Sequence, residues 1–343
     1  MSYRIILIVD IYPDNTNSSK HFYQEWESRD SINYLANVLN NLGYDTEIIE
    51  PIYNRDRILF ELYSIIKKRK ESKTILWNLV EGFYSPNREA YIPSIAEFFG
   101  IPFVGSEASA QILSLNKKLT LEIANSIGIP IPWNIICEDK EKIPELEQEN
   151  FPIFIKPIFE GSSLGISENS IIYNQTDLIN FIRNSSQILF PLIIEEYLPG
   201  KEYTLGIIGQ KEKLRTLQLC EIITKGVYSE EIKSKNHLSE KIIPQDENIL
   251  PEIKNLTIML SKKMGVSCYG RADWKMNKFG KPVFLELNLT PGLSPFYSSF
   301  PITYGEGKDS YSKMISEIIE ISMLEYDSFS RRYGKTRGLK SKK

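Results

Sequence analysis

The chain has 343 residues, of which 42% are hydrophobic and 25% are charged, and its formal net charge is −3. This length and composition are typical of a globular protein with two or three domains. The charge is too balanced to create the basic field that attracts nucleic acid, and no apolar stretch approaches the roughly 18 residues that a membrane span needs. We therefore expect neither nucleic acid nor a membrane as a partner.

Cysteine and histidine are scarce and scattered. Cys137, Cys220 and Cys268 stand far apart, which argues against a disulfide framework or a zinc cluster and fits a reducing cytoplasm. His21 and His237 are the only histidines, which argues against a histidine-based nucleophile or a histidine-rich metal site. Any chemistry must then rest on carboxylates, lysines, arginines and backbone amides.

The first third of the chain alternates strand and helix patterns. Residues 3–50 predict a β-α-β unit, and the apolar start suits a first strand better than a secretion signal. A buried strand at 73–82, a helix at 88–100 and a strand at 101–105 follow. Residues 1–116 are therefore predicted to form an open α/β domain with a largely parallel sheet.

From residue 117 the pattern changes to α+β. Short strands such as 151–159 (FPIFIKPIF) are mixed with helices such as 175–184 (QTDLINFIRN). This mixture predicts antiparallel sheets with segregated helices. The basic end of the chain, 331–343, is predicted to be a solvated tail.

The stretches 269–276 (YGRADWKM) and 283–288 (VFLELN) predict a β-hairpin. A four-residue loop at 277–280 would pair Met276 with Lys281 and place Arg271 opposite Glu286. Side chains two apart on a strand share a face, so this register brings several polar side chains together inside an apolar sheet.

Three of those side chains carry oxygen ligands: Asp273, Glu286 and Asn288. A buried carboxylate is normally paired or bound to a metal, and oxygen ligands alone favour magnesium or manganese. Phosphate oxygens are expected to complete the metal shell. The alternative is a cross-strand ion pair between Arg271 and Glu286 with Asp273 as a bystander.

Lys156 lies inside an apolar strand and therefore requires an anion. The loop 160–165 (EGSSLG) follows at once, and Gly161 and Gly165 permit its backbone amides to surround phosphate oxygens. A plain hairpin turn is the alternative interpretation of this loop.

The stretch 192–209 (LIIEEYLPGKEYTLGIIG) adds a strand end and a carboxylate. The main chain at Tyr197 and Leu198 could meet an adenine edge, and Glu202 lies where it could hold ribose hydroxyls. An ordinary exposed strand end is the alternative.

Together these stretches resemble the ATP-grasp superfamily, and within it the D-alanine–D-alanine ligase branch. The matching phrases, in family order over about residues 75–300, are GIPFVGSEASAQILSLNKKLT, FIKPIFEGSSLGIS, IIEEYLPGKEYTLGIIG, YGRADWKM and FLELNLTPGLS. The resemblance implies a three-domain fold, with an N-terminal α/β domain at 1–116 and two subdomains, 117–192 and 193–330, that clamp ATP.

The resemblance also implies an activity. ATP phosphorylates a small carboxylate substrate to an acyl phosphate, and an amine substrate then attacks it to form an amide, with release of ADP and phosphate. Two Mg²⁺ ions, for which Mn²⁺ could substitute, would assist, and a homodimer is the family expectation.

Site residues follow from the resemblance by position. The nucleotide residues would be Lys117 and Lys156 at the phosphates, Ser162 and Ser163 in the covering loop, Glu195, Tyr197 and Leu198 at the adenine, and Glu202 at the ribose. The metal ligands would be Asp273, Glu286 and Asn288. The catalytic groups would be Arg271, the Gly292 amide, Ser162 and Lys233.

The substrate motifs depart from this family. Glu81 replaces a histidine, Lys233-Ser234 replaces a Lys-Tyr pair in the expected lid at 225–239, and Phe296 and Tyr297 crowd the turn where a Ser-Leu pair is expected. Glu27 is the candidate for orienting the donor amine. We therefore predict a ligase with a non-standard substrate pair. A true D-alanine–D-alanine ligase and a non-catalytic nucleotide-binding protein are the alternatives.

Overall fold

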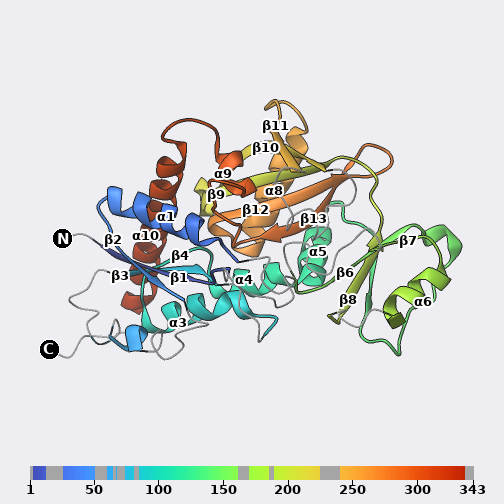
Figure 1. The fold of residues 1–343 in the computed structure, drawn as a ribbon, viewed down its shortest axis with the longest axis horizontal. Coiled ribbons are helices and arrows are strands. Elements are labelled where there is room, and N and C mark those ends of the chain that lie inside the picture. The colour runs from blue at the N-terminus through green and yellow to red at the C-terminus, as the bar shows by residue number, and fades with distance from the viewer. Residues whose placement is uncertain are drawn as a thin grey trace.

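A computed structural model describes residues 3–12, 26–50, 60–64, 67, 74–80, 85–160, 170–184, 189–224 and 240–336. The described residues form three sheets with helices packed around them (Figure 1). No described helix combines the length and the apolar character that crossing a membrane requires. The predicted lid at 225–239 and the candidate residues Glu81, Ser162, Ser163, Lys233 and Ser234 lie outside the described residues.

The first sheet is parallel, as predicted, with the order β2-β1-β3-β4. Its strands are β1 (Arg4–Val9), β2 (Asp45–Ile49), β3 (Thr74–Leu79) and β4 (Phe103–Val104), accompanied by α1 (Arg29–Asn41), the 3₁₀ helix η2 (Arg88–Ala90) and α3 (Tyr91–Phe99). Helix α1 begins where the Ser28 side chain accepts a hydrogen bond from the Ser31 amide, which satisfies a free N–H of the first turn. Gly43, with φ of +89°, then turns the chain into β2.

The middle sheet is antiparallel, with the order β5-β8-β6-β7. Its elements are β5 (Asn134–Cys137), η3 (Gln148–Asn150), β6 (Ile153–Pro157), β7 (Ile171–Ile172), α6 (Gln175–Asn184) and β8 (Leu192–Glu196). Since β8 pairs with β5 and β6 as far as Glu196, the predicted boundary after residue 192 falls within a strand of this sheet. The division into domains as a whole stays a prediction.

The third sheet has the order β11-β10-β9-β12-β13. Its elements are β9 (Glu202–Gln210), η5 (Lys211–Lys213), β10 (Arg215–Thr224), β11 (Glu240–Pro244), α8 (Pro251–Met264), β12 (Ser267–Met276), β13 (Pro282–Asn288) and α9 (Ser299–Tyr304). Helices α4 (Ala108–Leu115) and α5 (Lys117–Ser126) share an apolar cluster with this sheet through buried residues such as Ala110 and Leu121. Lys117, which is predicted to contact the nucleotide phosphates, is therefore carried by a helix that packs on the third sheet.

Helix α10 (Ser310–Thr336) returns to the first sheet (Figure 1). Its residues Met314 and Ile318 share one apolar cluster with Ile5 and Leu7 of β1 and with Tyr269 of β12. Since α10 extends to Thr336, the predicted solvated tail at 331–343 begins inside a helix. Arginine and lysine, which are common in this tail, favour helix nearly as well as leucine does.

The predicted β12–β13 hairpin forms, but its turn is one residue longer than expected. Met276 pairs with Pro282 and not with Lys281. The Asn277 N–H donates to the Lys281 carbonyl, and its side-chain oxygen accepts from the Lys281 amide, so these two residues close the turn themselves. Asparagine favours such local side-chain bonds, which the pattern of apolar residues cannot reveal.

A bulge between Asp273 and Trp274 shifts the register again. As a result, Asp273 lies opposite Glu286 and Arg271 lies opposite Asn288, and the predicted pairing of Arg271 with Glu286 is wrong. A shift of one residue would turn the side chains of one strand to the other face of the sheet, and a second shift of one residue turns them back. The predicted gathering of these four side chains therefore survives the error in register.

Candidate active site

Asp273 is buried on the face shared by β12 and β13. Its carboxylate accepts from Thr204 Oγ1 at 2.7 Å and from Arg271 Nη2 at 2.7 Å. Burial raises the pKa of Asp273, the Arg271 guanidinium opposes that rise, and the nearby Glu286 carboxylate reinforces it. The face therefore holds two carboxylates that favour an additional positive charge beside Arg271.

The donor set on this face suits a magnesium ion. Asp273 and Glu286 supply carboxylates, and the Asn288 side-chain oxygen is oriented by the Thr290 amide at 2.8 Å. Within the described ranges, no three His, Cys, Asp or Glu side chains gather as a complete metal site. Since protein commonly gives Mg²⁺ one or two carboxylates and leaves other positions to phosphate or water, this incomplete set fits.

Two buried lysines adjoin the carboxylates. Lys117 Nζ lies 3.7 Å from Glu286 Oε2 and also donates to the backbone carbonyl of Glu160. Lys156 Nζ lies 2.7 Å from Glu195 Oε1, and both side chains are buried. The sequence predicted that Lys156 needs an anion, and the Glu195 carboxylate supplies part of that negative charge.

Burial acts to lower the pKa of Lys156, but the carboxylates of Glu195, Glu286 and Glu202 outweigh it, so the pKa is raised and the lysine stays charged. The other oxygen of Glu195, Oε2, is buried with no hydrogen-bond partner among the described residues. A buried carboxylate oxygen without a donor is costly, so this oxygen is ready to accept from an N–H or O–H of a ligand.

The neighbouring strand ends are partly occupied. The Tyr197 amide donates to the Pro152 carbonyl at 3.2 Å, so that N–H is already used, and the Leu198 side chain is buried. Glu202 accepts from Lys275 Nζ at 2.8 Å across β9 and β12. The predicted nucleotide residues with described positions therefore lie on α5, on the interior strands β6, β8 and β9, and in the segment between β8 and β9.

Glu27 of the first domain lies against the loop that carries Gly292. Its Oε1 accepts from the Leu293 amide at 3.1 Å, and its Oε2 accepts from the Tyr297 hydroxyl at 2.8 Å. A Cβ on Gly292 would come within 2.6 Å of Ser298 Oγ and 3.2 Å of Glu27 Oε1, so a side chain there would collide with both. The predicted substrate residues Glu27 and Tyr297 thus meet beside the predicted oxyanion donor.

Phe296 and the two serines after Tyr297 contact different parts of the protein. Phe296 is 60% exposed and its ring meets the edge of Tyr34, so it does not fill the turn as predicted. Ser299 Oγ accepts from Arg271 Nη1 at 3.2 Å, and Ser298 Oγ accepts from the Ser294 amide at 3.1 Å. Hydroxyl groups therefore do lie next to Arg271 and Gly292.

Comparison with known proteins decides the family. Residues 123–320 match the family model described as D-ala D-ala ligase C-terminus. The D-alanine–D-alanine ligase of Aquifex aeolicus is 30% identical over 287 residues, which cover 83% of this chain and 92% of that protein. The chain belongs to the D-alanine–D-alanine ligase family. It is an ATP-grasp ligase, an enzyme that forms carbon–nitrogen bonds, as the resemblance predicted.

Solved structures of D-alanine–D-alanine ligases share the fold. The Bacillus anthracis ligase complexed with ATP superposes with a TM-score of 0.68 at 22% identity, covering 96% of this chain and all of that one. The Coxiella burnetii ligase gives 0.73 at 14% identity, covering 98% of each chain. At these identities the structures establish the ATP-grasp architecture alone.

Sequence reasoning missed a pair of buried charges in this ligase. Arg88 Nη2 lies 3.2 Å from Glu160 Oε2, at the start of the predicted phosphate loop. Glu89 accepts from Thr290 Oγ1 at 2.6 Å, two residues beyond the metal-type Asn288. The consecutive Arg-Glu before an apolar helix was visible in the sequence, but its burial was not.

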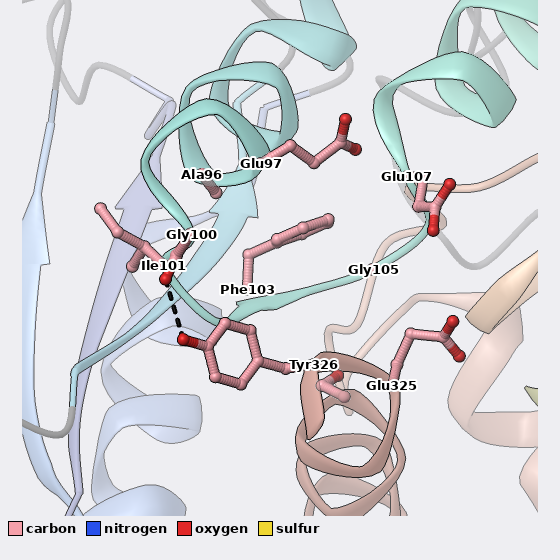
Figure 2. A pocket seen from close by; sticks show the side chains of 10 residues that line it. Ala96, Glu97, Gly100, Ile101, Phe103, Gly105, Glu107, Glu325 and Tyr326 are labelled. Atoms are coloured by element: carbon pink, nitrogen blue, oxygen red, sulfur yellow. Dashed lines mark hydrogen bonds between the residues drawn. The ribbon is translucent and has the colours of Figure 1, made fainter. Parts of the chain in front are cut away.

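A small cavity elsewhere in the ligase shares no residue with this site. It lies among α3, the turn after β4, and α10, and Figure 2 shows the Tyr326 hydroxyl donating to the Gly100 carbonyl at its edge. Its carboxylates have protein partners: Glu97 accepts from the Ala108 amide, and Glu325 accepts from Ser267 Oγ. We regard it as a junction between the first sheet and α10.

Proposed function

We propose that this chain is an ATP-dependent D-alanine–D-alanine ligase. ATP would phosphorylate the carboxylate of one D-alanine, and the amine of a second would attack the acyl phosphate, releasing ADP and phosphate. The names of the similar proteins support this substrate, since those cited are D-alanine–D-alanine ligases, apart from one D-Ala:D-Ser ligase from Enterococcus faecalis. They offer no support for the non-standard substrate pair predicted from the sequence.

The observation that carries the proposal is the position of Arg271. Its guanidinium donates to the Asp273 carboxylate and to the hydroxyl of Ser299, so one cation would adjoin both the transferring phosphoryl group and the acceptor. The sequence suggested that the hydroxyl needed for an amino-acid carboxylate was lost. Ser299 beside Arg271 offers such a hydroxyl, which favours an acceptor with a free carboxylate.

The roles of the nucleotide groups follow from their charges. Lys117 and Lys156 would neutralise ATP phosphates, and the open oxygen of Glu195 would accept from the adenine amino group. Mg²⁺ held by Asp273, Glu286 and Asn288 would neutralise charge on the transferring phosphoryl group. Arg271 and the Gly292 amide would stabilise the charge that develops at the acyl centre.

The test is to incubate the purified chain with Mg-ATP and D-alanine, measuring ADP by a coupled assay and the dipeptide by mass. We expect equal amounts of ADP and D-alanyl-D-alanine, and no dipeptide from L-alanine. ADP release that requires an added amine or acid other than D-alanine would revive the non-standard pair. Absence of ADP with every substrate would favour a non-catalytic nucleotide-binding protein.

A cytoplasmic location and a homodimer also stay proposals. Cell fractionation tests the first, and light scattering of the purified chain tests the second.

A further inference from the structure

The hydroxyl of Tyr297 lies at the centre of a polar network between two segments that are far apart in the sequence. It donates to Glu27 Oε2 at 2.8 Å and accepts from the Ser28 amide at 3.0 Å, and Ser31 Oγ lies 3.1 Å away. One side-chain oxygen therefore holds both Ser28, the N-cap of α1, and Glu27, the residue before it.

The same network reaches the loop that carries the Gly292 amide. Glu27 Oε1 accepts from the Leu293 amide, and Ser31 Oγ donates to Ser294 Oγ at 2.7 Å. A Cβ built on Gly292 would lie 3.2 Å from Glu27 Oε1. The Glu27 carboxylate therefore packs directly against this loop.

Glu27 is an unusual residue to bury without a cation. It is 9% exposed, and among the described residues no lysine or arginine forms an ion pair with it. Burial raises its pKa, and the hydrogen bonds from Tyr297, Leu293 and Ser294 oppose that rise. Burying a carboxylate without a cation is unfavourable, and three hydrogen-bond donors offset part of that cost. In return, the carboxylate holds those three donors in fixed positions.

We propose that Tyr297 is a positioning residue for the ligase reaction. Its hydroxyl fixes the Glu27 carboxylate, and Glu27 in turn fixes the Leu293 amide and the adjacent Gly292 amide. The first domain would thereby set the position of the loop that stabilises the acyl centre. This inference rests on the proposed function, because it assigns Gly292 a place in that reaction.

Tyr297→Phe tests the proposal, because it removes the hydroxyl and keeps the ring. We expect kcat for D-alanyl-D-alanine formation to fall roughly 10- to 100-fold, since small displacements of a catalytic group have effects of this size, while KM for ATP stays unchanged. Glu27→Gln/Tyr297→Phe should be no slower than the slower single variant, because both residues act through one loop. A double variant whose losses multiply would overturn this coupling.

Hydrogen exchange supplies a readout that does not need turnover. The Leu293 amide should exchange faster in Tyr297→Phe than in the original chain, because its acceptor is less firmly held. Tyr34→Phe is the matched control, since Tyr34 is 41% exposed and packs against Phe296. It should change neither exchange nor kcat.

The outcomes separate the two proposals. If the original chain makes no dipeptide, the proposed function fails, and the exchange experiment still decides whether Tyr297 positions the loop. If the chain makes the dipeptide and Tyr297→Phe matches it in both kcat and exchange, the positioning role is overturned and the proposed function stands.

Discussion

The Glu286 carboxylate lies near both a like charge and an opposite charge. It faces Asp273 across the β12–β13 hairpin, which places like charges together, and it lies 3.7 Å from the Lys117 ammonium. Its side chain is 29% exposed, so water screens both interactions. Such a carboxylate adds little to stability.

We therefore expect Glu286→Gln to lower the rate of ADP release by more than about 100-fold, since even the indirect partners of metal ligands commonly account for 10- to 100-fold. The free energy of unfolding should hardly change. The measurement is ADP release over a range of Mg²⁺ concentrations. Glu221→Gln is the control, because Glu221 pairs with Lys201 at 3.0 Å on the outer part of the third sheet. Normal release by Glu286→Gln at low Mg²⁺ would contradict the metal assignment.

Helices α9 and α10 carry two tyrosines with opposite surroundings. Tyr304 donates to Glu317 Oε2 at 2.8 Å, and burial together with Glu317 raises the pKa of Tyr304 to about 12. The hydroxyl of Tyr311 is buried and has no hydrogen-bond partner in the described part of the chain. A satisfied hydroxyl stabilises the fold, whereas an unsatisfied one has lost its water without replacement.

Tyr311→Phe should accordingly raise the free energy of unfolding by about 1 kcal/mol, because it removes a desolvated hydroxyl and keeps the ring. Tyr304→Phe should lower it by a similar amount. Urea unfolding of both variants, followed by tryptophan fluorescence, checks the two signs. A lower stability for Tyr311→Phe would mean that its hydroxyl has a partner after all.

The hairpin shows which elements the sequence could predict. Alternation of apolar and polar residues predicted β12, β13 and the shared face of Asp273, Glu286 and Asn288, because alternation is a local property of a strand. The register was wrong because the Asn277 turn and the bulge at Asp273 depend on local hydrogen bonds. The match of many motifs in order predicted the ATP-grasp fold, which no single strand could do.

Contacts between distant segments were beyond prediction. Glu27 could be named as a candidate, but its bond with Tyr297 and the bond of Ser299 with Arg271 depend on how segments far apart in the sequence pack together. Those two contacts also changed the functional interpretation, because they place hydroxyl groups where the sequence suggested a lost serine.

At the scale of the whole molecule, η2 contacts segments that adjoin the middle sheet and the third sheet. Arg88 pairs with Glu160, whose carbonyl accepts from Lys117, and Glu89 accepts from Thr290 at the end of β13. Two adjacent buried charges thus reach the lysine side and the metal side of the site. This arrangement fixes η2 against both the Lys117 side and the Thr290 side of the candidate site.

We expect Glu160→Gln to lower the free energy of unfolding by roughly 3 kcal/mol at most, since breaking a buried ion pair costs about 3–5 kcal/mol and Glu160 is 21% exposed. Arg88→Met/Glu160→Gln should lose less than the sum of the single variants, because no unpaired charge is left. Chemical unfolding of all three variants measures this. Arg215→Met, at an exposed pair with Glu317, is the control. Fully additive losses would contradict the coupling.

The apolar cluster that joins β1 to α10 has a consequence for synthesis on the ribosome. Ile5 and Leu7 emerge about 300 residues before Met314 and Ile318 do. At about 5–20 residues per second, the face of β1 that α10 covers must wait on the order of tens of seconds for its partner. During that time the nascent first sheet exposes isoleucine and leucine to chaperones and proteases, and the arrival of α10 completes this apolar cluster.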